Sequence, residues 1–203
     1  VEAKNQGHIS QVLVWGCLSQ RYREELIEAI PEVDRFFGAY DLDNILAYLG
    51  VEKNPLLLTQ RYLTTPKHYA YLKISEGCDR QCSYCAIPGI RGRHISVPIE
   101  ELVREAEFLA SIGVKELILI AQDTTYYGLD IYRKRALAQL IERLEAIKGI
   151  EWIRIHYSYP ASFPDDVLEI MAHSPKVCKY MDIPLQHSAD KVLAAMRRNI
   201  DGK

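Results

Sequence analysis

Three closely spaced cysteines are the residues of this chain best suited to chemistry. Cys78, Cys82 and Cys85 fall within eight consecutive positions, with the spacing C-x3-C-x2-C. Thiolates this close together can bind a soft metal, whereas three thiols on one short loop cannot all pair as structural disulfides. The spacing differs from the paired C-x2-C motifs of zinc ribbons and from the ferredoxin motifs. Three ligands leave one metal position open, which favours a catalytic centre.

The open position has two explanations. An iron-sulfur cluster with one free position suits the binding and activation of a small molecule better than electron storage. The alternative is a zinc site in which His94 or His68 joins the three cysteines. Neither histidine has the short ligand spacing of a zinc finger, so we favour the cluster. Iron and sulfide analysis would distinguish the two.

Composition indicates a globular chain with reduced thiols. With 203 residues and 48% hydrophobic content, it can form one large domain, or one domain and a piece of another. No run of about 18 apolar residues occurs, and residues 1–20 lack a secretory signal pattern. Five cysteines without such a signal predict a cytoplasmic protein that does not enter a membrane. The net charge of -2 gives no overall basic surface for nucleic acid, although Arg80, Arg91, Arg93 and His94 crowd the cysteine loop.

Residues 1–50 predict part of a smaller α/β domain. Strands are expected at residues 11–15 and 34–40, and helices at residues 23–30 and 42–49. Cys17 directly follows Gly16 where the first strand ends, a place that would face a cleft. A lone cysteine is usually a small buried hydrophobic residue, so this pattern alone assigns it no role. Residues 51–67 contain two prolines and no clear helical period, which predicts a linker.

Residues 68–203 alternate strands with helices. The expected strands are residues 69–74, 116–121, 152–158 and 180–185. The expected helices start at Pro98 and end before Gly113, span 137–147 and 164–173, and run from Ser188 to near Lys203. Such alternation predicts right-handed βαβ units and a parallel sheet, either open or closed into a barrel.

Polar residues follow the predicted strands, at the ends where α/β proteins place their chemistry. We expect these residues to surround the same cavity as the cysteine loop: Gln122, Asp123, Ser158, Gln186 and His187. The alternative for each is a local capping role. Asp123 and Thr124 could hold a turn, and Ser188 could cap the last helix.

The cysteine motif resembles the signature of the radical S-adenosylmethionine (SAM) enzymes, with Tyr84 in its aromatic position. This resemblance implies a partial parallel (βα) barrel, here preceded by part of a smaller α/β domain. It also implies that Cys78, Cys82 and Cys85 each bind one iron of a 4Fe-4S cluster, whose fourth iron binds SAM. Reductive cleavage then releases methionine and a 5'-deoxyadenosyl radical. We expect the cofactors to be contacted by Tyr84, Gln122, Asp123, Ser158, Gln186 and His187.

Longer stretches resemble the methylthiotransferases within this superfamily. They are residues 16–22, 77–92, 113–125, 179–187 and 196–198. Ala-Ile-Pro at 86–88, Gln-Asp-Thr-Thr at 122–125 and Leu-Gln-His at 185–187 look like the branch that modifies a ribosomal protein rather than tRNA. The resemblance implies addition of a methylthio group to the β-carbon of an aspartate in ribosomal protein S-twelve. One departure is Ser96-Val97-Pro98, where the family usually has an arginine after the serine.

The family resemblance also implies a second, auxiliary 4Fe-4S cluster bound by three amino-terminal cysteines. Only Cys17 of these is present, and the family's last barrel strands and carboxyl-terminal domain are missing, so the chain looks like a fragment. Expected partners are ribosomal protein S-twelve or the small ribosomal subunit, and an electron donor such as flavodoxin. Two alternatives stay open: a tRNA methylthiotransferase using the same chemistry, and a non-catalytic iron-sulfur or zinc binding module.

Overall fold

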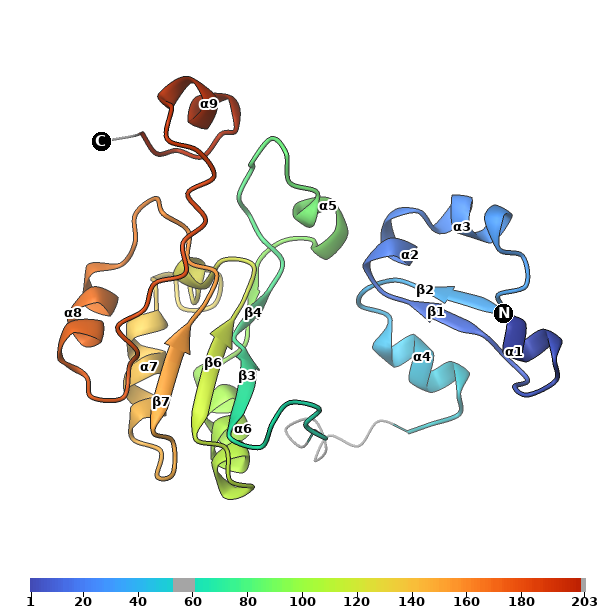
Figure 1. Cartoon of the computed structure of the whole chain (residues 1–203), viewed down its shortest axis with the longest axis horizontal. Coiled ribbons are helices and arrows are strands. Elements are labelled where there is room, and N and C mark those ends of the chain that lie inside the picture. The colour runs from blue at the N-terminus through green and yellow to red at the C-terminus, as the bar shows by residue number, and fades with distance from the viewer. Residues whose placement is uncertain (53–60, 202–203) are drawn as a thin grey trace. The chain divides into compact units, whose positions relative to one another are not determined.

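A computed structural model describes residues 1–52 and 61–201 of the chain (Figure 1). The chain divides into two compact units. The first contains residues 1–52 together with Gly89–Arg91, and the second contains the other described residues. The division falls within the predicted linker at 51–67, of which residues 53–60 lie outside the described residues.

The first unit is built on two parallel strands. Strand β1 (Leu13–Trp15) pairs with β2 (Arg35–Phe37), with Val14 opposite Phe36. Its helices are α1 (Glu2–Asn5), α2 (Cys17–Arg21), α3 (Arg23–Ala29) and α4 (Leu42–Tyr48). The two predicted strand and helix pairs therefore form, each within a few residues of its expected bounds.

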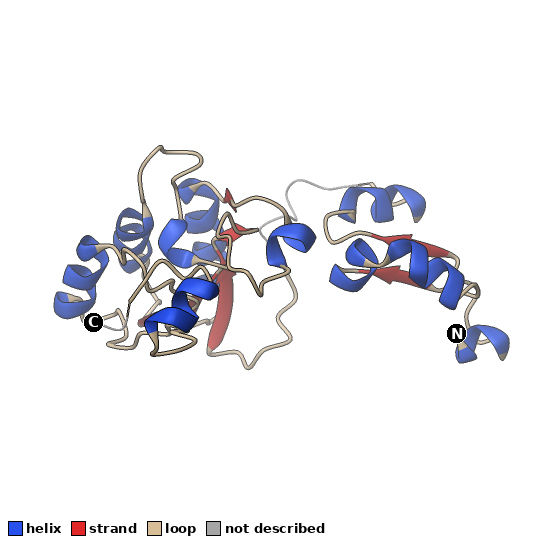
Figure 2. Ribbon diagram, turned by 90° about the horizontal axis from the view of Figure 1, so that it is seen from above, coloured by secondary structure: helices blue, strands red, loops and turns tan. Residues whose placement is uncertain are grey.

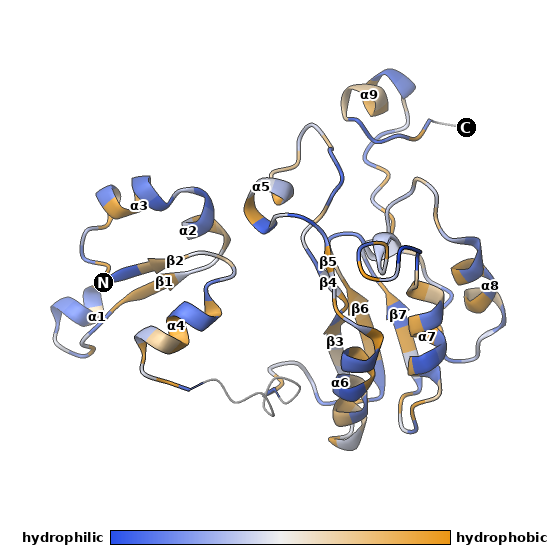
Figure 3. Cartoon of the chain, turned by 180° about the vertical axis from the view of Figure 1, so that it is seen from behind, coloured by the Kyte–Doolittle hydropathy of each residue, from blue (hydrophilic) through white to orange (hydrophobic). Residues whose placement is uncertain are grey.

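The second unit is built on a parallel sheet in the order β3-β6-β7, which is labelled in Figure 1. Figure 2 shows strands in red and helices in blue from above. The strands are β3 (Tyr69–Lys73), β6 (Glu116–Ile120) and β7 (Trp152–Ile155). Leu117 and Leu119 of the central strand are fully buried, as the nearly continuous apolar run predicts. In Figure 3, β6 is coloured as hydrophobic along most of its length.

Three helices connect and flank these strands: α6 (Ile99–Ser111), α7 (Leu137–Glu145) and α8 (Asp165–His173). Helix α6 packs against β3, α7 packs against β7, and α7 also contacts both other helices. Pro98 occupies the N-cap of α6, and Gly113, with a φ of 99°, follows its end. Gly113 matches the expected stop signal, because a positive φ costs glycine little. The sequence predicted Pro98 at the first helical position, and it lies one residue before that position.

The predicted fourth strand at residues 180–185 is wrong. The chain there runs as a loop, and beyond β7 the described residues form a single isolated parallel bridge, between Ile153 and Val177. Pro184 has no N–H to donate to a neighbouring strand. Met181 and Leu185 are exposed, because no further strand in the described part of the chain covers them.

The last helix is also shorter than predicted. Helix α9 spans Asp190–Ala195, with Ala189 rather than Ser188 at its N-cap. Arg197 and Asn199 adopt φ values of 53° and 55°, which end the right-handed helix.

Several elements around the cysteine loop were not predicted. Strand β4 (Ser75–Glu76) pairs antiparallel with β5 (Ile95–Ser96), and α5 (Ile87–Arg91) lies in the chain between them. A 3-10 turn, η2 (Thr124–Tyr126), follows β6. The β4 and β5 pair joins the two ends of the cysteine loop. No helix in the described residues is long and apolar enough to span a membrane.

Candidate functional site

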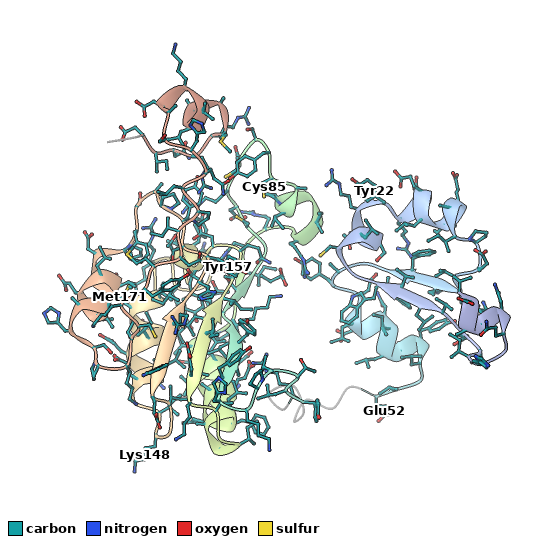
Figure 4. All side chains as sticks on the ribbon, in the orientation of Figure 1. Tyr22, Glu52, Cys85, Lys148, Tyr157 and Met171 are labelled. Atoms are coloured by element: carbon teal, nitrogen blue, oxygen red, sulfur yellow. The ribbon has the colours of Figure 1, made fainter. Side chains whose placement is uncertain are left out.

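The three clustered cysteines line one cavity of about 210 Å3, which we call the cysteine cavity. Its other walls come from the residues that follow β6 and β7 and from the segment around α9. Figure 4 labels Cys85 on the cysteine loop and Tyr157 just beyond the end of β7. Four of the six predicted cofactor contacts also line this cavity: Tyr84, Gln122, Ser158 and Gln186.

The cysteines differ in their surroundings. Cys78 is buried, and the loss of solvent raises the pKa of its thiol. The backbone N–H of Arg80 points toward Cys78 Sγ at 3.4 Å. Cys82 Sγ lies 3.5 Å from Nη1 of Arg198 and 3.9 Å from the hydroxyl of Tyr159. Metals bind the thiolate form of cysteine, and the N–H of Arg80 and the guanidinium of Arg198 place donors beside two of these sulfurs.

The residues present fit a thiolate-bound cluster, although they do not form a closed metal site. Within residues 1–52 and 61–201, no three His, Cys, Asp or Glu side chains already converge on a metal position. The fit rests on the donor set: three thiols line one cavity, together with two arginines. Buried polar atoms there also have no hydrogen-bond partner among the described residues, namely Arg80 Nη2, Arg198 Nε and Gln122 Oε1.

Arg80, which lies between two of the cysteines in sequence, is held by Asp123. Its Nε donates to Asp123 Oδ2 at 2.8 Å, and the side chain of Asp123 is almost fully buried. The other carboxylate oxygen accepts from the backbone N–H and the hydroxyl of Thr125, at 3.0 and 2.6 Å. The capping alternative for Asp123 is therefore confirmed. Asp123 is not among the residues that line the cavity, and its carboxylate holds the guanidinium of Arg80, which does line it.

Tyr159 packs against two arginines. The guanidinium carbon of Arg80 lies 3.9 Å from the ring centre, and that of Arg198 lies 4.3 Å from it. Both guanidinium groups therefore lie within cation–π distance of the same ring. Burial, with the neighbouring Cys82 thiol as the next cause, raises the pKa of Tyr159 to about 12. The ring therefore stays neutral, and each cation gains a cation–π contact.

The cavity wall that follows β6 and β7 is held by side-chain hydrogen bonds and contains two residues with positive φ. Gln122 Nε2 donates to Glu76 Oε1 at 2.8 Å, which ties the end of β6 to β4. Ser158 is buried, and its hydroxyl lies 3.4 Å from that of Thr124. Tyr157 and Gln186 have φ values of 58° and 77°. Residues other than glycine rarely adopt such φ values. Backbone strain of this kind tends to occur at functional sites.

His187 lies outside the cysteine cavity. It is exposed, and its Nδ1 accepts a hydrogen bond from the backbone N–H of Ala189 at 2.9 Å. The histidines of the zinc alternative do not line the cavity either. His94 is buried elsewhere, with Nε2 3.0 Å from the hydroxyl of Ser96, and burial lowers its pKa. His68 packs against Tyr69 at the start of β3.

The two remaining cysteines are not among the residues that line the cysteine cavity. Cys17 opens α2 in the first unit, is partly buried, and follows Gly16 with its φ of 135°. Cys178 is partly buried, donates its backbone N–H to Ile153 at 2.9 Å, and has its pKa raised by burial. Cys178 therefore packs beside β7, where its backbone N–H bonds to Ile153.

The sequence patterns assigned no role to Tyr159 or Arg198, and they placed Arg80 only among the basic residues that crowd the cysteine loop. Arg80 could have been singled out because it lies inside the cysteine motif. Arg198 lies in a Met-Arg-Arg sequence that resembles the family, but nothing local distinguishes it from the exposed Arg197. Only the fold turns one of these two arginines inward.

Comparison with known proteins identifies the superfamily of this chain. The profile of the radical SAM superfamily matches residues 72–203. A Flavobacterium johnsoniae protein named ribosomal protein uS12 methylthiotransferase RimO is 59% identical over 197 residues, which are 97% of this chain and 45% of that protein. A Bacteroides fragilis protein of the same name is 54% identical over 202 residues, which are 100% of this chain and 47% of that protein. The chain thus spans about half the length of these relatives.

Solved structures share the fold at low sequence identity. The radical SAM methyltransferase TsrM from Kitasatospora setae, with tryptophan and a SAM analogue bound, has a TM-score of 0.52 at 15% identity. That match covers 68% of this chain and 28% of TsrM. The open parallel sheet, without a closed barrel in the described residues, agrees with the partial barrel that we expected. Because the superfamily profile covers well over half of its residues, the chain belongs to the radical SAM superfamily.

Proposed function

We propose that the protein is a radical SAM methylthiotransferase that adds a methylthio group to the β-carbon of an aspartate in ribosomal protein S-twelve. One observation carries the proposal: Cys78, Cys82 and Cys85 line one cavity, in a chain 59% identical to a protein named for this activity. The name of the relative supports the substrate, and the cavity supports the chemistry. Because the chain spans about half of the relative, activity and substrate are proposed for the whole protein.

The three cysteine thiolates would hold a 4Fe-4S cluster. Such a cluster, with SAM on its free iron, supplies a carbon radical that can take a hydrogen atom from an unactivated carbon. The chain's residues must bind and orient the cofactors and keep water away. Arg80 and Arg198 supply positive charge beside the thiolates, and both guanidinium groups contact the ring of Tyr159.

The SAM contacts in this proposal are those predicted from the sequence. Tyr84, Gln122, Ser158 and Gln186 already line the cavity, which supports their assignment. Asp123 would act through Arg80, whose guanidinium it fixes at 2.8 Å. His187 requires a change in the loop before α9, since its ring now accepts from Ala189. Its assignment is the least supported of the six.

The remaining parts of the proposal concern the first unit and the partners. Cys17 would be one ligand of the auxiliary cluster, with residues 1–50 part of the amino-terminal domain and 68–203 the radical SAM domain. Its place at the start of α2, partly exposed after a glycine, is compatible with a ligand. An electron donor such as flavodoxin, the small ribosomal subunit as partner and a cytoplasmic location complete the proposal.

Mass spectrometry of ribosomal protein S-twelve tests the proposed function. The gene for the whole protein is deleted, and the strain is complemented with the wild type or with Cys82→Ala. We expect methylthiolated aspartate in the parent and the wild-type complement, and unmodified protein in the other two strains. Methylthioadenosine in tRNA that is lost with the gene, with the ribosomal protein unmodified throughout, would favour the tRNA alternative.

A further inference from the structure

Arg198 is buried in the wall of the cysteine cavity. Only 3% of it is exposed, which is unusual for an arginine. Its Nη1 atom lies 3.5 Å from Cys82 Sγ, and Nη2 donates to the carbonyl oxygen of Pro184 at 2.5 Å. Its guanidinium carbon lies 4.3 Å from the ring centre of Tyr159. A planar group with several fixed donors can make all three contacts together, which a lysine cannot do.

The backbone around Arg198 is bent to bring it inward. Arg197 and Asn199, its two neighbours, both adopt left-handed φ values of 53° and 55°. Neither is a glycine, so the turn is strained on both sides of the buried side chain. Tyr159 stabilises the turn by donating its hydroxyl to the carbonyl oxygen of Arg198 at 2.6 Å. The strained backbone at Arg197 and Asn199 therefore directs the side chain of Arg198 into the protein, where it is buried.

The same segment is tied to the cysteine loop by a second residue. Ser83, next to Cys82, donates its backbone N–H to the carbonyl of Met196 at 3.2 Å. Its hydroxyl donates to the carbonyl of Ala195 at 2.9 Å. Hydrogen bonds therefore join the end of α9 to the cysteine loop beside Cys82, and they help to fix the distance between Arg198 and Cys82.

We infer that Arg198 is a positioning residue that holds Cys82 and raises the reduction potential of the cluster bound there. This inference rests on the proposed function in one respect, that Cys82 is a cluster ligand. A reduced cluster carries one more negative charge than an oxidised one. A buried cation and an N–H donor at a ligand sulfur stabilise that extra charge, and hydrogen bonds to sulfur are a principal control of cluster potentials.

The test measures the potential of the reconstituted cluster in arginine variants. Arg198→Gln removes the charge, and Arg198→Lys keeps the charge but loses the planar fork. The matched control is Arg197→Gln, because Arg197 is the exposed neighbour in the same strained turn. Each chain is reconstituted anaerobically, its iron and sulfide are counted, and the potential is titrated by electron paramagnetic resonance.

We expect Arg198→Gln to destabilise the reduced state of the cluster tenfold relative to the oxidised state. For a one-electron couple this lowers the reduction potential by about 59 mV. Arg198→Lys should fall between it and the wild type, and Arg197→Gln should match the wild type. An unchanged potential in Arg198→Gln would overturn the inference. If that variant fails to fold, an unchanged potential in Arg198→Lys overturns it instead.

The outcome for Cys82 separates this inference from the proposed function. Cys82→Ala should lose the cluster. Full iron and sulfide in Cys82→Ala would refute the ligand assignment itself, and with it the premise of the Arg198 inference. A normal loss in Cys82→Ala together with a wild-type potential in Arg198→Gln would refute only the role of Arg198.

Discussion

The sulfur of Cys82 has two polar neighbours, the guanidinium of Arg198 and the hydroxyl of Tyr159. Two thiolates with a third position open to water cannot retain a cubane cluster for long. We therefore predict that Cys82→Ala loses most of its bound iron and sulfide, and with them the brown absorbance of the wild type. Chemical analysis of iron and sulfide per chain measures the loss.

Cys178→Ala provides the matched control for this prediction. Cys178 is also a partly buried free cysteine of the second unit, but it does not line the cysteine cavity. Its alanine variant should keep the wild-type cluster content. Equal loss of iron in both variants would mean that cysteine removal destabilises the unit generally, and the ligand assignment would lose its support.

His94 makes stability depend on pH. It is 4% exposed, and its Nδ1 has no hydrogen-bond partner in the described part of the chain. Burial lowers its pKa, with Arg80 acting in the same direction, while Asp130, Asp123 and Asp79 oppose the shift. The unfolded chain therefore binds the proton first as pH falls. The contribution of neutral His94 to the free energy of unfolding is complete above about pH 6.5. It is lost progressively as the pH falls below that value.

We predict that this loss appears as a falling thermal midpoint between about pH 7 and pH 5. His94→Gln should flatten that part of the curve, because glutamine does not titrate. His173→Gln is the control, since His173 is exposed at the end of α8. The same slope in wild type and His94→Gln would contradict the assignment of the pH dependence to His94.

At the scale of elements, the pairing of β4 with β5 closes the cysteine loop. Gly77, which follows β4 with a φ of 76°, lies against the backbone of Arg93. A methyl group built on Gly77 would overlap the carbonyl oxygen of Arg93. Because that oxygen belongs to the backbone, the overlap can be relieved only if the two ends of the loop separate.

We predict that Gly77→Ala lowers the free energy of unfolding by more than about 2 kcal/mol, since the left-handed conformation alone costs alanine roughly 1–2 kcal/mol. Gly113→Ala separates the two effects. Gly113 also has a positive φ, 99°, but a methyl group there meets nothing within 4 Å. Its variant should lose only the free energy that the positive φ costs alanine. Denaturant unfolding of both variants checks the difference, and equal losses would show that the approach to Arg93 has no role.

At the scale of the whole molecule, the cysteines limit how many clusters the chain can hold. Cys17 is the single cysteine of residues 1–67, and one thiolate cannot hold a 4Fe-4S cluster. We predict that anaerobic reconstitution of this 203-residue chain gives close to one cluster per chain. Slow cleavage of SAM without product is the most activity that we expect from it, because sulfur transfer is proposed to need the auxiliary cluster.

Counting iron, sulfide and methylthiolated aspartate in one reconstitution tests this prediction. About two clusters per chain, or modified aspartate formed from reductant, sulfide and SAM, would contradict it. Cys17→Ala is the internal control, and its cluster count should equal that of the unchanged chain. A lower count in Cys17→Ala would mean that the first unit contributes a ligand to the cluster that forms.

Elements with strong periodic patterns were predicted within a few residues. The apolar run of β6 and the stripe of α6 between Pro98 and Gly113 are examples, because burial of one face or both leaves a direct record in the sequence. The predictions at 180–185 and 188–203 were wrong in type or length. The first depends on a neighbouring strand and the second on the backbone angles after the helix. Neither property can be seen in the local sequence pattern.

The sequence by itself predicted the three clustered cysteines as ligands and most of the alternation of strands and helices, because spacing and periodicity are local properties. Its motifs also carried the resemblance to the radical SAM superfamily. Only the tertiary structure decided which polar residues meet. It brought Gln122, Ser158 and Gln186 to the cysteines and left His187 outside. It also buried Arg198 and exposed Arg197, two identical neighbours. The physical reason is that burial of a cation depends on contacts from segments far apart in the chain, here Cys82, Tyr159 and Pro184.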